Sequence, residues 1–132
     1  MAVAYWCILL AALLPYMWVA VAKSGAPGYD NRDPRSWLAR QDSRRVRNAN
    51  AAHQNAFEAF PAFAASVLMA QLAGVDPARI GLLAMAFVVL RVLHGLFYIG
   101  GIHRLRSLAW FGGLACVLAL LAQAALRIQA AA

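Results

Sequence analysis

Polar and ionisable side chains at helical spacing interrupt two otherwise apolar stretches of this sequence. In the first stretch, residues three or four apart share one face of a helix: Arg47, Asn50, Gln54, Glu58 and Pro61. An ionisable group at the mouth of an apolar helix is costly and usually faces protein or a water-filled cavity. The stripe is therefore either a binding surface or a set of hydrogen bonds that join helices.

The second stretch carries Arg91, His94 and Tyr98 at positions i, i+3 and i+7, which again share one face. Arg91 lies about 11 residues into its apolar segment, near the middle of a membrane at ~1.5 Å per residue. Glu58 is the carboxylate available to it or to a ligand ammonium. If Arg91 pairs inside the protein, its loss would orphan that partner. An ion pair alone would leave His94 and Tyr98 without a role.

Basic residues mark the end of the second stretch, and antiparallel packing would bring both stretches to a similar depth. Arg104 and Arg106 either snorkel to lipid phosphates or join the site. Asn55, three residues before Glu58, would then lie near Tyr98. Several cations, a carboxylate, amides and a phenol suit an anion with two carboxylates, an ammonium and a soft ionisable atom. A nearby arginine can also lower the pKa of a thiol.

The composition places these residues in a membrane. Of 132 residues, 64% are hydrophobic and 13% charged, a balance too apolar for a soluble surface. Four apolar segments, at about 2–22, 56–75, 80–102 and 108–126, each have close to the ~20 residues that a bilayer core requires. Lipid-exposed backbone must satisfy its own hydrogen bonds, so each segment should be helical.

The fold class predicted is therefore all-α, an integral membrane four-helix up-down bundle in one domain. Its helices are expected at about 2–22, 43–74, 78–102 and 105–128, with a polar cytoplasmic loop at about 23–42. The second helix should begin near Ser43, because nothing breaks a helix between there and Pro61. The first segment could instead be a signal peptide, but no basic residue precedes it and its apolar run is long.

The charge pattern sets the expected orientation. The net charge is +7, and nearly all Lys and Arg fall on one side of a four-helix topology, with only Arg79 and Arg127 on the other. By the positive-inside rule the first side is cytoplasmic and both termini are not. Cys7 and Cys116 lie within apolar runs and are interpreted as packing residues. Zinc-ligand spacing and phosphate loops are absent.

The segments AAHQNAFEAFPAFAASVLMA and RVLHGLFYIGGIHRLRSLAW together resemble the membrane-associated proteins in eicosanoid and glutathione metabolism, the MAPEG family. The most specific part is N-x-x-E (Asn55, Glu58) followed by R-x-x-H-x-x-x-Y (Arg91, His94, Tyr98). The resemblance is closest to the short bacterial branch, which implies a bacterial inner membrane. It also implies a homotrimer that binds glutathione between neighbouring subunits, toward the cytoplasmic side.

The resemblance also implies roles for particular residues. Asn55 and Glu58 match positions that contact glutathione, with Glu58 near its amino end. Tyr98 and His94 match positions in the same site. An arginine after the tyrosine would stabilise the thiolate, and we favour Arg104, with Arg106 close behind.

Other positions match less well. The arginine expected one turn before Asn55 is absent, because position 51 is Ala51, and Arg47 is a substitute. Gln54 neighbours the site on the same stripe. Arg32 in the first loop could bind a glutathione carboxylate.

Two functional classes follow. The first is a glutathione-dependent transferase or peroxidase that acts on lipophilic electrophiles or lipid peroxides entering from the membrane. The second is a non-catalytic membrane protein of the same fold, either a structural trimer or a binder of another small anionic or lipid ligand. An ion or proton pathway through Glu58, Arg91 and His94 is disfavoured, because the outer halves of the last three apolar helices offer almost no polar groups.

Overall fold

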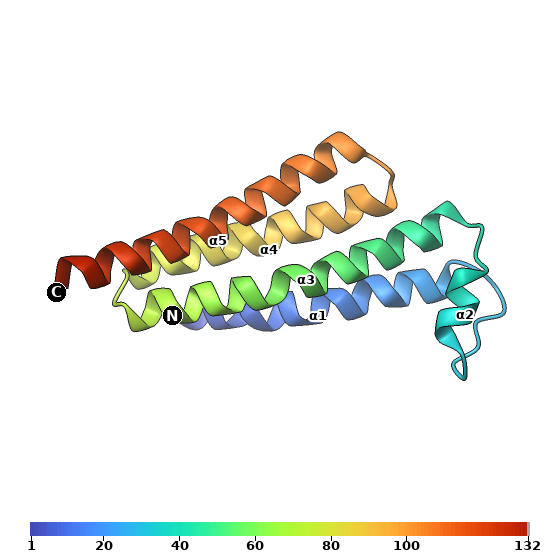
Figure 1. Cartoon of the computed structure of the whole chain (residues 1–132), viewed down its shortest axis with the longest axis horizontal. Coiled ribbons are helices and arrows are strands. Elements are labelled where there is room, and N and C mark those ends of the chain that lie inside the picture. The colour runs from blue at the N-terminus through green and yellow to red at the C-terminus, as the bar shows by residue number, and fades with distance from the viewer. Residues whose placement is uncertain (132) are drawn as a thin grey trace.

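Four long helices run beside one another, and a short helix lies across one end (Figure 1). The computed structural model describes residues 1–131. Its helices are α1 (Ala2–Ser24), α2 (Pro34–Ala39), α3 (Arg44–Leu72), α4 (Pro77–Ile99) and α5 (His103–Ala131). The described residues contain no strand, which confirms the all-α prediction. Helix α3 contacts α1, α4 and α5, so side chains on its different faces meet different neighbours.

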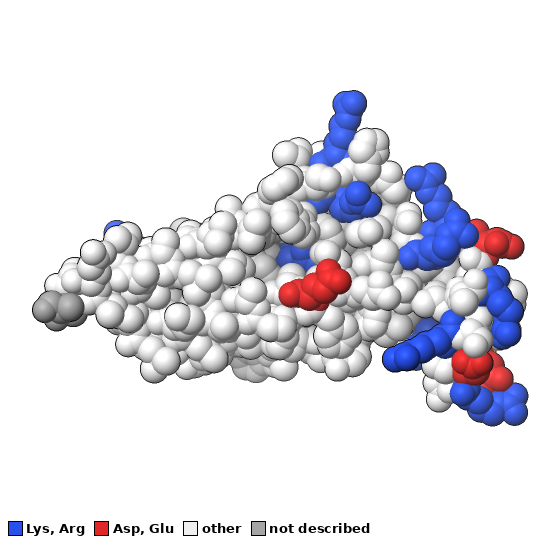
Figure 2. All heavy atoms as spheres, in the orientation of Figure 1, with Lys and Arg blue, Asp and Glu red and all other residues white. Residues whose placement is uncertain are grey.

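Three of the long helices, α1, α4 and α5, have the length and apolar composition needed to cross a membrane. Helix α3 is not among them, because arginines and amides occupy its first turns, and Asn55, Glu58 and Gln71 interrupt its apolar part. Figure 2 shows charged side chains concentrated around the end that holds α2, with a smaller group part-way along the helices and a largely uncharged surface beyond it. Membrane-length helices are thus confirmed for three predicted segments, and for α3 the crossing stays a prediction.

Local signals in the sequence fix the helix ends. Helix α3 begins next to Ser43, near the predicted position, and the Ser43 hydroxyl caps it by accepting the backbone N–H of Val46 at 3.4 Å. The loop predicted over residues 23–42 contains a helix that we did not predict, α2, which Asp33 caps and Pro34 begins. Helix α4 ends at Ile99, earlier than the predicted 102, because Gly101 turns the chain with a φ of +73°.

The main core lies between the membrane-length helices and the second half of α3. Phe63 of α3 stacks on Phe87 of α4, with ring centroids 3.9 Å apart and planes within 6°. Alanines at many buried positions allow the helices to approach closely. Cys7 and Cys116 are both buried, which agrees with their interpretation as packing residues.

A second contact joins α1 to α4 closer to α2. The indole of Trp18, only 5% exposed, lies directly against Gly95 and occupies the space that a Cβ atom would need there. Because the indole ring is rigid, it has little freedom to move away from a larger residue. Gly95 is therefore required for α1 to pack on α4 at the level of the polar residues described below.

We expect Gly95→Ala to destabilise the protein by about 1–3 kcal/mol, because the added methyl group would overlap the indole of Trp18. Denaturant unfolding in detergent, followed by circular dichroism, measures the effect. Gly113→Ala is the matched control, because a Cβ there would meet its nearest neighbour, Arg91 Cδ, at an ordinary 3.6 Å. The control should equal or exceed the parent in stability, and equal stability of both variants would contradict this packing.

Candidate functional site

Helix α3 presents Asn55 and Glu58 toward α4 and α5, one turn apart. The Nδ2 atom of Asn55 donates a hydrogen bond to Oε2 of Glu58 at 3.2 Å. Asn55 is half-buried and Glu58 is exposed. The hydrogen bond holds the Glu58 carboxylate in place while leaving it accessible to a ligand.

Arg91 of α4 is the most deeply buried cation of this region, with only 4% of its surface exposed. Its Nη2 atom donates to the side-chain oxygen of Asn55 at 2.8 Å and to the backbone oxygen of Asn55 at 3.1 Å. Within residues 1–131 no carboxylate lies within 4 Å of its guanidinium, so Arg91 and Glu58 do not form an ion pair. Asn55 instead links the side chains of Arg91 and Glu58, and the Glu58 carboxylate stays open to a ligand.

A second group of side chains lies one turn further along α4 and on the start of α5. The buried ring of His94 meets the ring of Tyr98 edge to face, with centroids 5.5 Å apart. The Cζ atom of Arg106 lies 4.5 Å from the centroid of the Tyr98 ring, in cation–π geometry. Arg104 is exposed, and Arg106 is the arginine that contacts the Tyr98 ring; which of the two would stabilise a thiolate stays a prediction.

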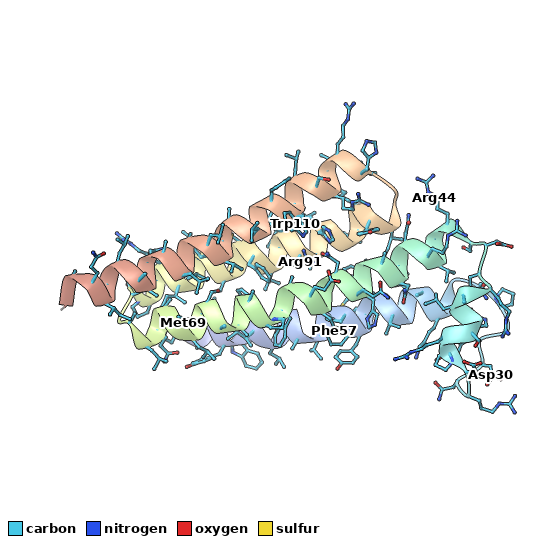
Figure 3. The ribbon with its side chains drawn as sticks, in the orientation of Figure 1. Asp30, Arg44, Phe57, Met69, Arg91 and Trp110 are labelled. Atoms are coloured by element: carbon cyan, nitrogen blue, oxygen red, sulfur yellow. The ribbon has the colours of Figure 1, made fainter. Side chains whose placement is uncertain are left out.

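These groups line two neighbouring cavities that share Asn55 and Trp110. The first, which we call the Glu58 cavity, has a volume of about 210 Å³ between α3, α4 and α5. It is lined at one end by Asn55, Glu58 and Arg91 and otherwise by apolar side chains. The second, the Tyr98 cavity, has about 330 Å³ and is lined by His94, Tyr98, Arg106, Ser107 and Phe111, together with Asn55 and Trp110, which also line the first. Figure 3 shows Arg91 on α4 and Trp110 on α5 at a similar level along the helices.

The structure therefore brings Asn55, Glu58, His94, Tyr98 and Arg106 into one region within a single chain. The polar groups are the Glu58 carboxylate, the half-buried Arg106 guanidinium, the Tyr98 phenol and the Asn55 amide. The rest of the Glu58 cavity is lined by apolar side chains. Such a site can hold a polar anion at one end and an apolar group at the other.

Other predicted site residues lie elsewhere. Gln54 faces the opposite side of α3, where it lines a third cavity of about 510 Å³ with Lys23, Asn50 and His53, between α1, α2 and α3. We call this the Lys23 cavity. His53 is held by a 2.8 Å contact between its Nδ1 atom and the backbone oxygen of Pro15. The stripe predicted on α3 is thus divided between two faces.

Arg47 and Arg32 contact residues of the connection between α1 and α3 in this structure. Arg47 donates to the backbone oxygens of Gln41 and Asp42, which ties the chain before α3 to its first turn. Arg32 forms an ion pair with Asp30 at 3.0 Å, and its side chain is 91% exposed. That pairing lowers the pKa of the Asp30 carboxyl below its usual value. Neither arginine lines the Glu58 or Tyr98 cavity.

Sequence reasoning missed Ser107 and Trp110 as lining residues. Trp110 lies four positions after Arg106, which places both on one face of α5, and Ser107 lies three positions before Trp110. Helical spacing from Arg106, which was already a candidate, could have identified them.

These features define an all-helical membrane protein with a polar site set among membrane-length helices. The sequence model of the MAPEG family matches residues 3–126, nearly the whole chain, and the protein belongs to that family. The family includes glutathione transferases and peroxidases as well as non-catalytic members. Comparison with curated protein sequences gave no significant match.

Proposed function

We propose that the protein is a membrane-bound, glutathione-dependent transferase or peroxidase that acts on lipophilic electrophiles or lipid peroxides. The observation that carries the proposal is that the Glu58 and Tyr98 cavities share Asn55 and Trp110 in their linings. The Glu58 carboxylate and the Arg106 guanidinium therefore line neighbouring cavities. Glutathione offers the complementary groups, namely an ammonium, two carboxylates and a thiol.

The charges of the site support a role for each residue. The Glu58 carboxylate, held by Asn55, would take the glutathione ammonium. Arg106, on the Tyr98 ring, would stabilise the thiolate, because a neighbouring cation lowers the pKa of a thiol. The apolar part of the Glu58 cavity would receive the hydrophobic acceptor from the bilayer.

The division of the α3 stripe supports the assembly that the family resemblance implies. In the proposed homotrimer of four-helix bundles, α3 is the fourth membrane-crossing helix and glutathione lies between neighbouring subunits. The Glu58 and Tyr98 cavities would be one half of each site. The Lys23 cavity of the neighbour, with Gln54 and His53, would supply the other half and a second cation.

The uneven distribution of basic residues along the helices supports a proposed orientation in the membrane. The basic residues of the α1–α3 connection and of the α4–α5 turn lie at one end of the helices, which we propose faces the cytoplasm of a bacterium. Both termini would then lie on the other side of the inner membrane.

Binding of glutathione to the purified protein in detergent, measured by isothermal titration calorimetry, tests the proposal. We expect Glu58→Gln to weaken binding about tenfold, because the ammonium loses a charge-assisted hydrogen bond while the new amide can still accept from Asn55. Asp42→Asn, a matched carboxylate-to-amide change in the loop, should leave binding unchanged. An absence of binding heat from the parent protein would contradict the proposal.

A non-catalytic binder of the same fold is the second candidate. Two observations favour it: Arg104 is exposed, and Arg91 already donates a hydrogen bond to Asn55. Arg106 is therefore the one arginine lining the two cavities that is left to stabilise a thiolate. Conjugation of chlorodinitrobenzene discriminates between the candidates, because only a site that generates a thiolate accelerates it.

A further inference from the structure

A separate cavity lies at the opposite end of the helices from the charged loops, where the α3–α4 turn meets the last turns of α5. Figure 1 shows that this end also holds both chain termini. The cavity has a volume of about 330 Å³ and is lined by Val75, Asp76, Arg79, Gln123, Leu126 and Arg127. The proposed glutathione chemistry uses none of these residues.

The two arginines of this cavity come from different helices, Arg79 from the first turn of α4 and Arg127 from near the end of α5. Both are exposed, and within residues 1–131 neither guanidinium has a carboxylate within 4 Å. Within residues 1–131 they are also the only Lys or Arg side chains at this end of the long helices. Two guanidinium groups on one cavity can bind a phosphate together.

The same cavity contains a carboxylate and an amide. Asp76 caps α4, and its Oδ1 atom accepts the backbone N–H of Ala78 at 3.2 Å, which fixes the carboxylate beside the cavity. Gln123 donates from Nε2 to the backbone oxygen of Ala119 at 3.1 Å, so Oε1 is its free acceptor. These acceptors suit a ligand that also carries an N–H donor.

The position of the cavity indicates the source of such a ligand. Helices α4 and α5 are membrane-length, and the cavity lies at their ends, the level at which phospholipid headgroups lie. Leu126 is 63% exposed beside the cavity, and nearby Leu72 is 87% exposed, so apolar surface adjoins the polar groups. A headgroup could enter while its acyl chains lie along the helices.

We propose that this cavity binds the phosphoethanolamine headgroup of a phosphatidylethanolamine. Arg79 and Arg127 bind the phosphate, and Asp76 and Gln123 accept hydrogen bonds from the primary ammonium. A phosphatidylcholine ammonium has no N–H to donate to these acceptors. The headgroup of phosphatidylglycerol carries the same phosphate but no ammonium, so it would leave the Asp76 carboxylate without a cationic partner. The inference is independent of the proposed glutathione chemistry.

Native mass spectrometry of the full chain in detergent tests the proposal with equimolar phosphatidylethanolamine and phosphatidylcholine that carry the same acyl chains. We expect the parent to bind phosphatidylethanolamine roughly two- to fivefold more, the range of an exposed charge pair. Asp76→Asn should reduce that ratio to about one. The variant should still fold, because Asn caps a helix as well as Asp does.

Further variants and lipids separate this site from general lipid contact. Arg127→Gln should lower binding of both lipids, whereas Arg40→Gln, the same change at the other end of the helices, should alter neither. Equal binding of the two lipids by the parent, an unchanged ratio in Asp76→Asn, or a preference for phosphatidylglycerol would overturn the proposal. Competition by soluble glycerophosphoethanolamine at the same concentration would overturn its assignment to a membrane lipid.

Discussion

Replacing Arg106 by glutamine is expected to lower the rate of glutathione conjugation by about 100-fold or more, while Arg104→Gln leaves it nearly unchanged. The Arg106 guanidinium lies 4.5 Å from the Tyr98 ring centroid, and the Arg104 side chain is exposed. Loss of one preorganised group that stabilises a developing or bound anion costs ~10²–10³ in rate. The two substitutions are matched in chemistry and differ only in where the side chain lies.

The pH dependence of conjugation distinguishes an electrostatic role of Arg106 from a structural one. A cation beside the bound thiol lowers its pKa, so the thiolate forms at lower pH when the arginine is present. In Arg106→Gln the rising limb of the kcat/KM profile for chlorodinitrobenzene should therefore move to higher pH, and part of the lost rate should return there. An equal loss at every pH, or the larger loss in Arg104→Gln, would contradict this assignment.

Much of the fold was predictable because each signal is local. Apolar runs of membrane length predicted α1, α4 and α5, and the lack of a helix breaker between Ser43 and Pro61 predicted the start of α3. Helix α2 was missed although its signals are present, with Asp33 as N-cap and Pro34 at the first helical position. Six residues are too few for a periodic apolar pattern, and the same residue types also favour turns.

The sequence predicted the part of the site where residues on one face of α3 meet residues on one face of α4. N-x-x-E on α3 and the aligned Arg91, His94 and Tyr98 on α4 do converge. Helical spacing alone could not show that α3 has neighbours on opposite sides, α1 on one and α4 with α5 on the other. Gln54 and Asn55 are adjacent in sequence yet ~100° apart around the helix, so they line different cavities.

The contact between Asn55 and Arg91 predicts that replacing Asn55 destabilises the protein more than replacing Arg91 does. Asn55→Leu should destabilise the protein by about 1.5–3 kcal/mol, because it leaves the buried guanidinium with only the backbone oxygen of residue 55 as an acceptor. Arg91→Met should change stability by about 1 kcal/mol or less, because the partner left behind is a neutral, half-buried amide that still bonds Glu58. The sequence alone suggested the reverse concern, that removing Arg91 would orphan a charged partner.

Denaturant unfolding in detergent measures the free energy of unfolding of both single variants and of the double variant Asn55→Leu/Arg91→Met. Since the damage in Asn55→Leu comes from the isolated charge, removing that charge should restore most of the lost stability, and the two changes should not add. Additive losses would show that Asn55 stabilises α3 without acting through Arg91. If Arg91→Met alone were the more damaging change, the guanidinium would have to satisfy a charged partner, and Asn55 would not be the group that makes its burial possible.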